Sequence, residues 1–239
     1  MKKAISSRQN PLFRRIREAI RDHAGEIALE GPKQVADAIA AGWRPLAVVA
    51  RSRGHAVAQQ EIELTAELFD ALSETKNPQN VIALFERPVT NARDILGRRD
   101  TIAIALDGVQ DPGNVGTIVR LAAAFDAAGV LLLPGCADPF GPKAIRASAG
   151  AILNVPVASI TPRELLDAQV PLVVADMHGA TADPPARDAV LVFGNEGAGV
   201  SDELRRAASA IAIPMSDRVE SLNVASSAAI LLSRSFASR

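Results

Sequence analysis

The chain has 239 residues, of which 48% are hydrophobic and 22% are charged, and its formal net charge is −1 at pH 7. A chain of this size can bury a full hydrophobic core and is long enough for two compact domains. No apolar run approaches the roughly 18 residues that a membrane-spanning helix needs, and the basic start lacks the apolar stretch of a secretory signal. A single cysteine, Cys136, excludes a disulfide framework, and the three scattered histidines lack the spacing of metal ligands. We therefore expect a cytoplasmic protein without a metal.

The first ninety residues predict a small α/β domain. Helices are expected over 5–24, 32–41, 55–61 and 65–73, and strands over 26–30, 45–50, 62–64 and 81–85. Such alternation is typical of mixed α/β structure. A polar stretch containing Pro88, Asn91 and Gly97 follows. We therefore expect a first domain over 1–90, a linker over 91–99 and a second domain over 100–239.

The N-terminal segment is basic although the whole chain is nearly neutral. Residues 1–25 carry five more cationic than anionic side chains. Two interpretations remain open: a solvated amphipathic helix whose arginines face water, or a surface that contacts nucleic-acid phosphates. If the second holds, Arg8, Arg14 and Arg15 are the candidate contacts.

The second half predicts an open parallel sheet. Strands are expected over 101–106, 129–134, 172–177, 189–194 and 210–215, and helices over 115–126, 142–150, 162–169, 201–209 and 222–236. The strand segments are continuous apolar runs, as in parallel sheets covered on both faces. Sheets of this kind bind ligands at the carboxyl ends of their strands. Two strands followed by unusual loops, over 191–206 and 211–232, predict a cofactor pocket built largely from main chain.

The common nucleotide-binding signatures are absent. No G-x-x-x-x-G-K-[ST] loop occurs, and the glycines of GNEGAG (194–199) do not follow the order of the dinucleotide-binding fingerprint. A parallel-sheet protein that lacks both must bind its cofactor in another way.

Polar side chains near the strand ends each allow two interpretations. Asn114 is a good helix cap, and Arg120, which lies off the apolar stripe of its helix, fits a surface charge. Ser221 is a natural cap for the last helix, and Glu196 could bond its own loop. Capping does not explain the five small residues over 225–229, which allow close approach of a backbone or a ligand.

Three blocks then carry a resemblance that covers nearly the whole chain. They are DGVQDPGNVGTIVRLAAAF, LVFGNEGAGVS and IPMSDRVESLNVASSAAIL, in this order over 107–232. They resemble the signature motifs of the SpoU (TrmH) family of RNA ribose 2′-O-methyltransferases, within the SPOUT superfamily. Residues 5–16 and 72–84 are similar to the small substrate-binding domain of the rRNA-modifying members. The resemblance implies a C-terminal α/β domain with a deep trefoil knot, a small N-terminal α/β RNA-binding domain, bound S-adenosylmethionine and a homodimer.

The resemblance also implies the site residues. Main-chain groups of Gly194, Ile213 and Leu222 match the family's cofactor-binding positions. The remaining polar active-site positions fall on Asn114, Arg120, Glu196, Ser221 and Asn223. The family's proposed general base corresponds to Arg120, but a guanidinium is effectively never deprotonated in proteins. We therefore expect Arg120 to hold a phosphate and to stabilise the developing alkoxide.

The leading interpretation is an enzyme that methylates a ribose 2′-hydroxyl of ribosomal RNA. A tRNA substrate is the first alternative, and base methylation within the same superfamily fits the three blocks less well. A catalytically inactive RNA-binding protein of the same fold is the alternative outside enzymes.

Overall fold

The computed structural model describes residues 4–22, 25–52, 62–73, 75 and 77–238. The chain forms two compact units. The first comprises Met1–Pro88 with Phe140–Pro142, and the second comprises Val89–Pro139 with Lys143–Arg239.

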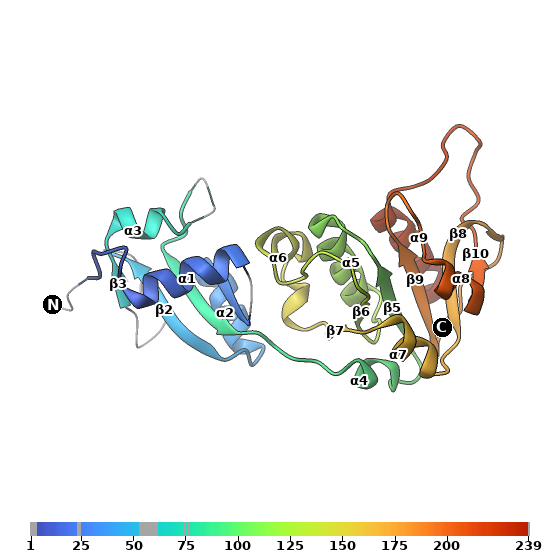
Figure 1. Ribbon diagram of the computed structural model, residues 1–239, viewed down its shortest axis with the longest axis horizontal. Coiled ribbons are helices and arrows are strands. Elements are labelled where there is room, and N and C mark those ends of the chain that lie inside the picture. The colour runs from blue at the N-terminus through green and yellow to red at the C-terminus, as the bar shows by residue number, and fades with distance from the viewer. Residues whose placement is uncertain (1–3, 23–24, 53–61, 74, 76, 239) are drawn as a thin grey trace. The chain divides into compact units, whose positions relative to one another are not determined.

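The first unit, coloured blue to green in Figure 1, is built on a mixed four-stranded sheet in the order β1-β4-β2-β3. Its strands are β1 (Glu26–Glu30), β2 (Pro45–Arg51), β3 (Ile62–Leu64) and β4 (Val81–Glu86), and its helices are α1 (Pro11–Asp22), α2 (Pro32–Ala40) and α3 (Ala66–Asp70). Strand β4 is antiparallel to β1 and β2, whereas β3 is parallel to β2. Phe13 and Ile16 of α1 pack into one core with Phe69 and Leu84. The expected helix near 55–61 lies outside the described residues.

The first helix begins later than expected. The sequence predicted a helix from residue 5, but α1 starts at Pro11, and the Asn10 side chain accepts a hydrogen bond from the Leu12 N–H at 2.9 Å. Proline is favoured in the first turn of a helix, which fixes this start. Ile5 instead extends the sheet, because its N–H donates to Glu63 and its carbonyl accepts from Thr65.

The second unit contains a six-stranded sheet in the order β10-β8-β9-β5-β6-β7, and every neighbouring pair is parallel. Its strands are β5 (Ile102–Asp107), β6 (Val130–Leu132), β7 (Val157–Ser159), β8 (Leu172–Ala180), β9 (Ala189–Gly194) and β10 (Ser209–Ile211). Its helices are α4 (Ala92–Leu96), α5 (Pro112–Ala124), α6 (Pro142–Ser148), the 3₁₀ turn η1 (Ala151–Leu153), α7 (Pro162–Asp167), α8 (Asp202–Ala207) and α9 (Val224–Ala237). The predicted parallel sheet is confirmed. β7 was not expected.

Both faces of this sheet are covered. Ala103 and Ala105 of β5 pack into a core with residues of α4, α7 and α8, including Leu165 and Leu204. On the other face, α9 contacts α5 and β9. Residues 102–106 are therefore buried on both sides, as continuous apolar strands require.

The segment expected as a linker, 91–99, contains the short helix α4. The Asn91 side chain caps it by accepting from the Arg93 N–H at 2.9 Å, and Ile95 is buried in the core of the second unit. The polar residues around it hid this packing, because only Ala92, Ile95 and Leu96 of the five-residue helix are apolar, and all three pack on the core of the second unit.

Candidate active site at the carboxyl edge of the sheet

The carboxyl ends of β5 and β9 bring two loops together. Asp107 and Gly194, the last residues of these strands, are partners in register. The Asp107 carboxylate accepts a hydrogen bond from the Ser201 N–H at 2.7 Å, and the Asn195 side chain donates to the Gly108 carbonyl at 2.8 Å. The loop after β5 and the loop after β9 are thus bonded to each other at the edge where parallel sheets bind ligands.

The loop after β9 closes on itself. Asn195 and Gly199 exchange two backbone hydrogen bonds, at 3.0 and 2.9 Å, and Gly199 has a φ of +72°, which favours glycine. Gly194 is needed for a different reason: a Cβ placed there would lie 2.1 Å from the Gly199 carbonyl carbon and 2.2 Å from the Val200 nitrogen. The strand end therefore touches the returning backbone of its own loop.

Three of the five predicted catalytic side chains form one chain of hydrogen bonds. The Asn114 amide donates to Glu196 at 2.9 Å, and its oxygen accepts from the Asn223 amide at 3.1 Å. The Asn223 oxygen accepts from the N–H groups of Ala225 and Ser226, at 2.9 and 3.3 Å. The carboxylate after β9, the first turn of α5 and the start of α9 are joined in this way.

The surroundings of Glu196 favour its ionised form. Partial burial raises the pKa of this carboxyl, but hydrogen bonds from the Asn114 amide and from the N–H groups of Glu196, Gln110 and Asp111 outweigh it. The net result is a lowered pKa. Glu196 is therefore a fixed acceptor that orients the Asn114 amide, since a carboxylate only accepts hydrogen bonds.

Asp111, and not Asn114, caps α5. Its carboxylate accepts from the Asn114 N–H at 3.0 Å and from the Lys143 ammonium at 2.6 Å. The hydrogen bond from Lys143, followed by that from the Asn114 N–H, lowers the pKa of Asp111. With the cap supplied by Asp111, the Asn114 side chain is available for Glu196 and Asn223, so the capping interpretation, one of the two left open for Asn114, is wrong.

The cap of the last helix lies two positions after Ser221, which was the cap candidate in the sequence. Asn223 caps α9, and Ser221 lies exposed before it. Of the small residues that follow, Ala225 and Ala228 are buried, and α9 contacts α5. The small residues therefore first serve close packing of the two helices.

Arg120 and Ser221 stay outside the hydrogen-bonded set. Arg120 is exposed on α5, and no hydrogen bond or ion pair among the described residues joins either side chain to Asn114, Glu196 or Asn223. Within one protomer, the structure brings together three of the five predicted catalytic residues.

Two of the three predicted cofactor positions lie on the loop between β10 and α9. Ile213 and Leu222 are half-buried, whereas Gly194 is buried at the end of β9. Among the described residues, the backbone groups of Ile213 and Leu222 form no hydrogen bond, and between them the loop makes a turn at Asp217 and Arg218. Unpaired main-chain groups at half-buried positions suit the polar edges of an adenine and a ribose, because such groups need partners. These residues fit S-adenosylmethionine.

The three arginines predicted to contact RNA lie in the first unit and differ in their contacts. Arg15 forms a two-pronged hydrogen-bonded ion pair with Glu26, and a guanidinium nitrogen of Arg8 lies 3.7 Å from a Glu67 oxygen. Arg14 is exposed. Arg15 therefore contributes to the fold of this unit as well as to its charge.

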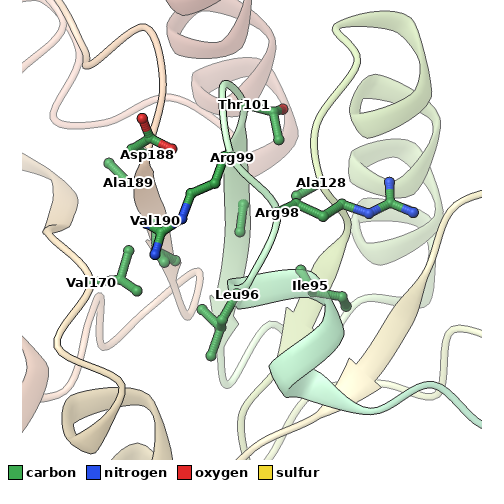
Figure 2. A pocket seen from close by; sticks show the side chains of 11 residues that line it. Ile95, Leu96, Arg98, Arg99, Thr101, Ala128, Val170, Asp188, Ala189 and Val190 are labelled. Atoms are coloured by element: carbon green, nitrogen blue, oxygen red, sulfur yellow. The ribbon is translucent and has the colours of Figure 1, made fainter.

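A shallow pocket lies at the opposite, amino edge of the sheet (Figure 2). It is lined by Ile95, Leu96, Arg98, Arg99, Thr101, Ala103, Ala128, Val170, Asp188, Ala189 and Val190. Figure 2 shows the Arg98 and Arg99 side chains extending in different directions, so they do not form one anion site. The hydrogen-bonded polar residues gather at the carboxyl edge, and we place the functional site there.

Within the described part of the chain, no helix is long and apolar enough to cross a membrane. In the same residues, no group of three or more His, Cys, Asp or Glu side chains has an arrangement that could hold a metal ion.

Sequence reasoning missed Asn195, to which it assigned no role, and the Asp111–Lys143 pair. A signal for Asn195 was present: an asparagine directly after a strand and followed by glycines is typical of a side chain that bonds its own backbone two residues on. The Asp111–Lys143 pair had no local signal, because its members are far apart in the sequence.

The chain matches known proteins over both units. The SpoU rRNA methylase family model matches residues 101–233, and a model of the MRM3-like substrate-binding domain matches residues 14–83. An uncharacterized tRNA/rRNA methyltransferase of Synechocystis sp. is 31% identical over 96% of this chain and 92% of its own length. The 23S rRNA (uridine(2479)-2′-O)-methyltransferase of Streptomyces viridochromogenes is 30% identical over 89% of this chain and 83% of its own length.

A solved structure agrees. The AdoMet-bound rRNA methyltransferase from Sinorhizobium meliloti matches with a TM-score of 0.86 and 31% identity, over 98% of this chain and 97% of that one. The parallel sheet, the bonded loops at its carboxyl edge and these matches lead to one conclusion: the chain belongs to the SpoU rRNA methylase family.

Proposed function

We propose that this chain transfers a methyl group from S-adenosylmethionine to a ribose 2′-hydroxyl of ribosomal RNA. The observation that carries the proposal is the chain of hydrogen bonds through Glu196, Asn114 and Asn223, which joins all three family motifs at one edge of the sheet. The relative from Streptomyces viridochromogenes, named as an rRNA 2′-O-methyltransferase, and the match to a substrate-binding domain support the same activity and substrate.

The main chain at Gly194, Ile213 and Leu222 holds the adenine and ribose of the cofactor in this proposal. When bound, S-adenosylmethionine supplies a methyl group on a sulfonium, which is already a good leaving group. The protein therefore mainly has to align the ribose oxygen behind the methyl carbon, and alignment of this kind can contribute roughly 7–11 kcal/mol.

The polar residues divide this work. Ionised Glu196 fixes the Asn114 amide, which in turn fixes Asn223, so both amides present defined donors and acceptors to the incoming ribose. Arg120 grips the adjacent phosphate and stabilises the developing alkoxide. The proton of the 2′-hydroxyl leaves through Ser221, water or that phosphate.

We further propose that the enzyme acts as a homodimer whose C-terminal domain contains the family's trefoil knot. Arg120 lies exposed and apart from the Asn114 network, so a second protomer would be the natural source of the missing partners. Phe236 of α9 is 45% exposed, and its ring lies 6.1 Å from that of Phe125. An exposed aromatic side chain on the α5–α9 surface supports self-association there.

We propose residues 1–90 as the RNA-binding domain, with Arg8, Arg14 and Arg15 on its RNA-facing surface, and residues 100–239 as the methyltransferase domain. The cytoplasm, where the RNA substrate is found, is the proposed location. Transfer RNA remains the alternative substrate.

The activity is tested with labelled S-adenosylmethionine and ribosomal RNA transcripts. We expect label in a ribose, which makes the neighbouring phosphodiester resistant to alkali. Replacing the target nucleotide by its 2′-deoxy form should abolish labelling, because the hydroxyl is the acceptor. Label that survives this replacement would indicate a base methylation, and absence of both labelling and cofactor binding would favour an RNA-binding protein without catalysis.

The role of Arg120 is tested by Arg120→Lys. This variant keeps the charge but loses the planar, two-pronged donor geometry. We expect kcat to fall by about tenfold or more while RNA binding is unchanged, as measured by single-turnover methyl transfer and fluorescence anisotropy. Near wild-type methyl transfer would contradict the role assigned to the guanidinium.

A further inference from the structure

We propose that Asn195 is the positioning residue that sets the orientation of Glu196 in this site. The inference rests on the proposed methyl transfer and concerns a residue of the block LVFGNEGAGVS that the proposed mechanism leaves without a role. Asn195 directly precedes Glu196 and lies where the strand β9 has just ended. Its role follows from three side-chain hydrogen bonds.

The Asn195 amide uses both of its ends. Its oxygen accepts from the N–H groups of Gly197 and Ala198, each at 2.9 Å, and its nitrogen donates to the Gly108 carbonyl at 2.8 Å. Rotating the amide by half a turn would place its NH₂ group against two N–H donors. These hydrogen bonds therefore permit only one orientation of the Asn195 amide. In that orientation the loop after β9 is held in one register against the loop after β5.

This register determines where Glu196 can bond. Gly108 lies just before Gln110 and Asp111, whose N–H groups donate to the Glu196 carboxylate at 3.3 and 3.4 Å. Bonds of that length are too weak to fix the loop by themselves. The shorter bond from Asn195 to Gly108 holds the two backbones at the separation that these contacts need.

Asn195 acts through its neighbour. Three of its hydrogen-bonding positions are occupied by the two loops, whereas the Glu196 carboxylate bonds directly to the Asn114 amide at 2.9 Å. Loss of the Asn195 side chain should therefore lower kcat by misplacing Glu196, while the KM for RNA, whose binding we assign to the first unit, stays the same.

A double-mutant cycle tests this dependence. We expect Asn195→Ala to lower kcat by about tenfold, the equivalent of one hydrogen bond between fixed groups. If Asn195 works through Glu196, then combining Asn195→Ala with Glu196→Gln should be no worse than Glu196→Gln alone, because coupled residues are not additive. Multiplying losses, or an unchanged kcat in Asn195→Ala, would overturn the proposal.

A matched control separates positioning from ordinary loop stability. Asn91 accepts a comparable backbone hydrogen bond, from Arg93 at 2.9 Å, at the cap of α4. Asn91→Ala should lower the melting temperature and leave kcat unchanged. If Asn195→Ala behaved in the same way, Asn195 would be structural only.

Two more variants keep the test decisive if Asn195→Ala folds poorly. Asn195→Ser retains an acceptor for the loop N–H groups but cannot reach Gly108, and Asn195→Asp retains the acceptor shape but places an oxygen against the Gly108 carbonyl. Both should lose kcat, with the KM for RNA unchanged; full activity in both would refute the role of the Gly108 bond.

Failure of the proposed function gives a different result. If the wild-type protein shows no methyl transfer, the same cycle is measured by thermal unfolding of the four proteins. Non-additive shifts would still support positioning of Glu196 by Asn195, whereas additive shifts would refute it independently of the enzymatic activity.

Discussion

Protonation of Glu196 gives a test at the scale of single residues. Its pKa is lowered in the folded protein, so its contribution to stability is present above the ordinary glutamate pKa of about 4.3 and is lost as the pH falls through the lower folded value. Glu196→Gln should therefore reduce the free energy of unfolding at pH 7, by less than about 1 kcal/mol because the side chain is exposed.

The measurement is urea unfolding of both proteins between pH 7 and pH 3. The difference between wild type and Glu196→Gln should shrink below about pH 4, when the wild-type carboxyl is protonated too. A difference that grows on acidification would contradict the assigned hydrogen bonds.

Gly194 and Gly197, which lie in the same segment, should respond differently to an added methyl group. At Gly194 the Cβ would lie 2.1 Å from backbone, so Gly194→Ala should cost about 1–3 kcal/mol of stability and weaken S-adenosylmethionine binding. At Gly197 the nearest contact is the Asn195 side-chain oxygen at 3.6 Å, and Gly197→Ala should be tolerated. Thermal unfolding and calorimetric titration of the cofactor measure both effects. Equal stability of the two variants would refute the close approach at Gly194.

The sequence indicated which residue types were polar at the strand ends, but not which of them bond one another. Asn114, Glu196 and Asn223 were identified through the family resemblance, and the structure joins them. The capping roles were misassigned because Asp111 and Asn223 compete with equally good caps nearby, and propensity alone does not rank them.

At the scale of elements, the start of α9 separates the two candidate caps. Asn223→Ala removes the acceptor for Ala225 and Ser226 and the donor to Asn114, so it should cost about 1 kcal/mol of stability. Ser221→Ala should leave stability unchanged, because Ser221 does not cap the helix. Urea unfolding of both variants checks this, and the reverse order of stabilities would place the cap at Ser221.

Elements with long apolar runs were predictable, whereas short ones were not. The strands β5 and β9 are six residues long and buried, so their continuous apolar pattern indicated a parallel sheet. β7 spans only Val157–Ser159, too few residues to show a period. The helix α4 has only five residues, which is also too short to show a period within its polar segment.

For the whole molecule, the distribution of charge predicts how RNA binding depends on salt. Arg14 is exposed, so Arg14→Glu should weaken binding of ribosomal RNA fragments and reduce the salt slope by about one, without loss of stability. Arg163→Glu, at an exposed arginine of the second unit, is the matched control and should leave the salt slope unchanged. Fluorescence anisotropy at several salt concentrations measures both, and equal slopes for the two variants would argue against an RNA contact at Arg14.

The overall architecture was predictable in class but not in detail. Alternating elements and continuous apolar strands indicated two α/β units, but no periodicity specifies a knot, which is nearly absent among proteins in general. The expectation of a knot came from the family motifs alone. Helical spacing did place Arg120 on the exposed side of α5, where the structure has it, but spacing does not say which exposed surface meets a partner.

The strand order has a consequence for the newly made chain during translation. β5 lies between β6 and β9, but β6 follows it by about twenty residues and β9 by more than eighty. Until residue 194 has left the ribosome, one edge of an apolar strand has no partner, and such edges pair readily with other chains. Parallel pairing across so long a separation is also slow. The nascent protein is therefore most prone to aggregate while its first unit is already complete and its catalytic sheet is still half assembled.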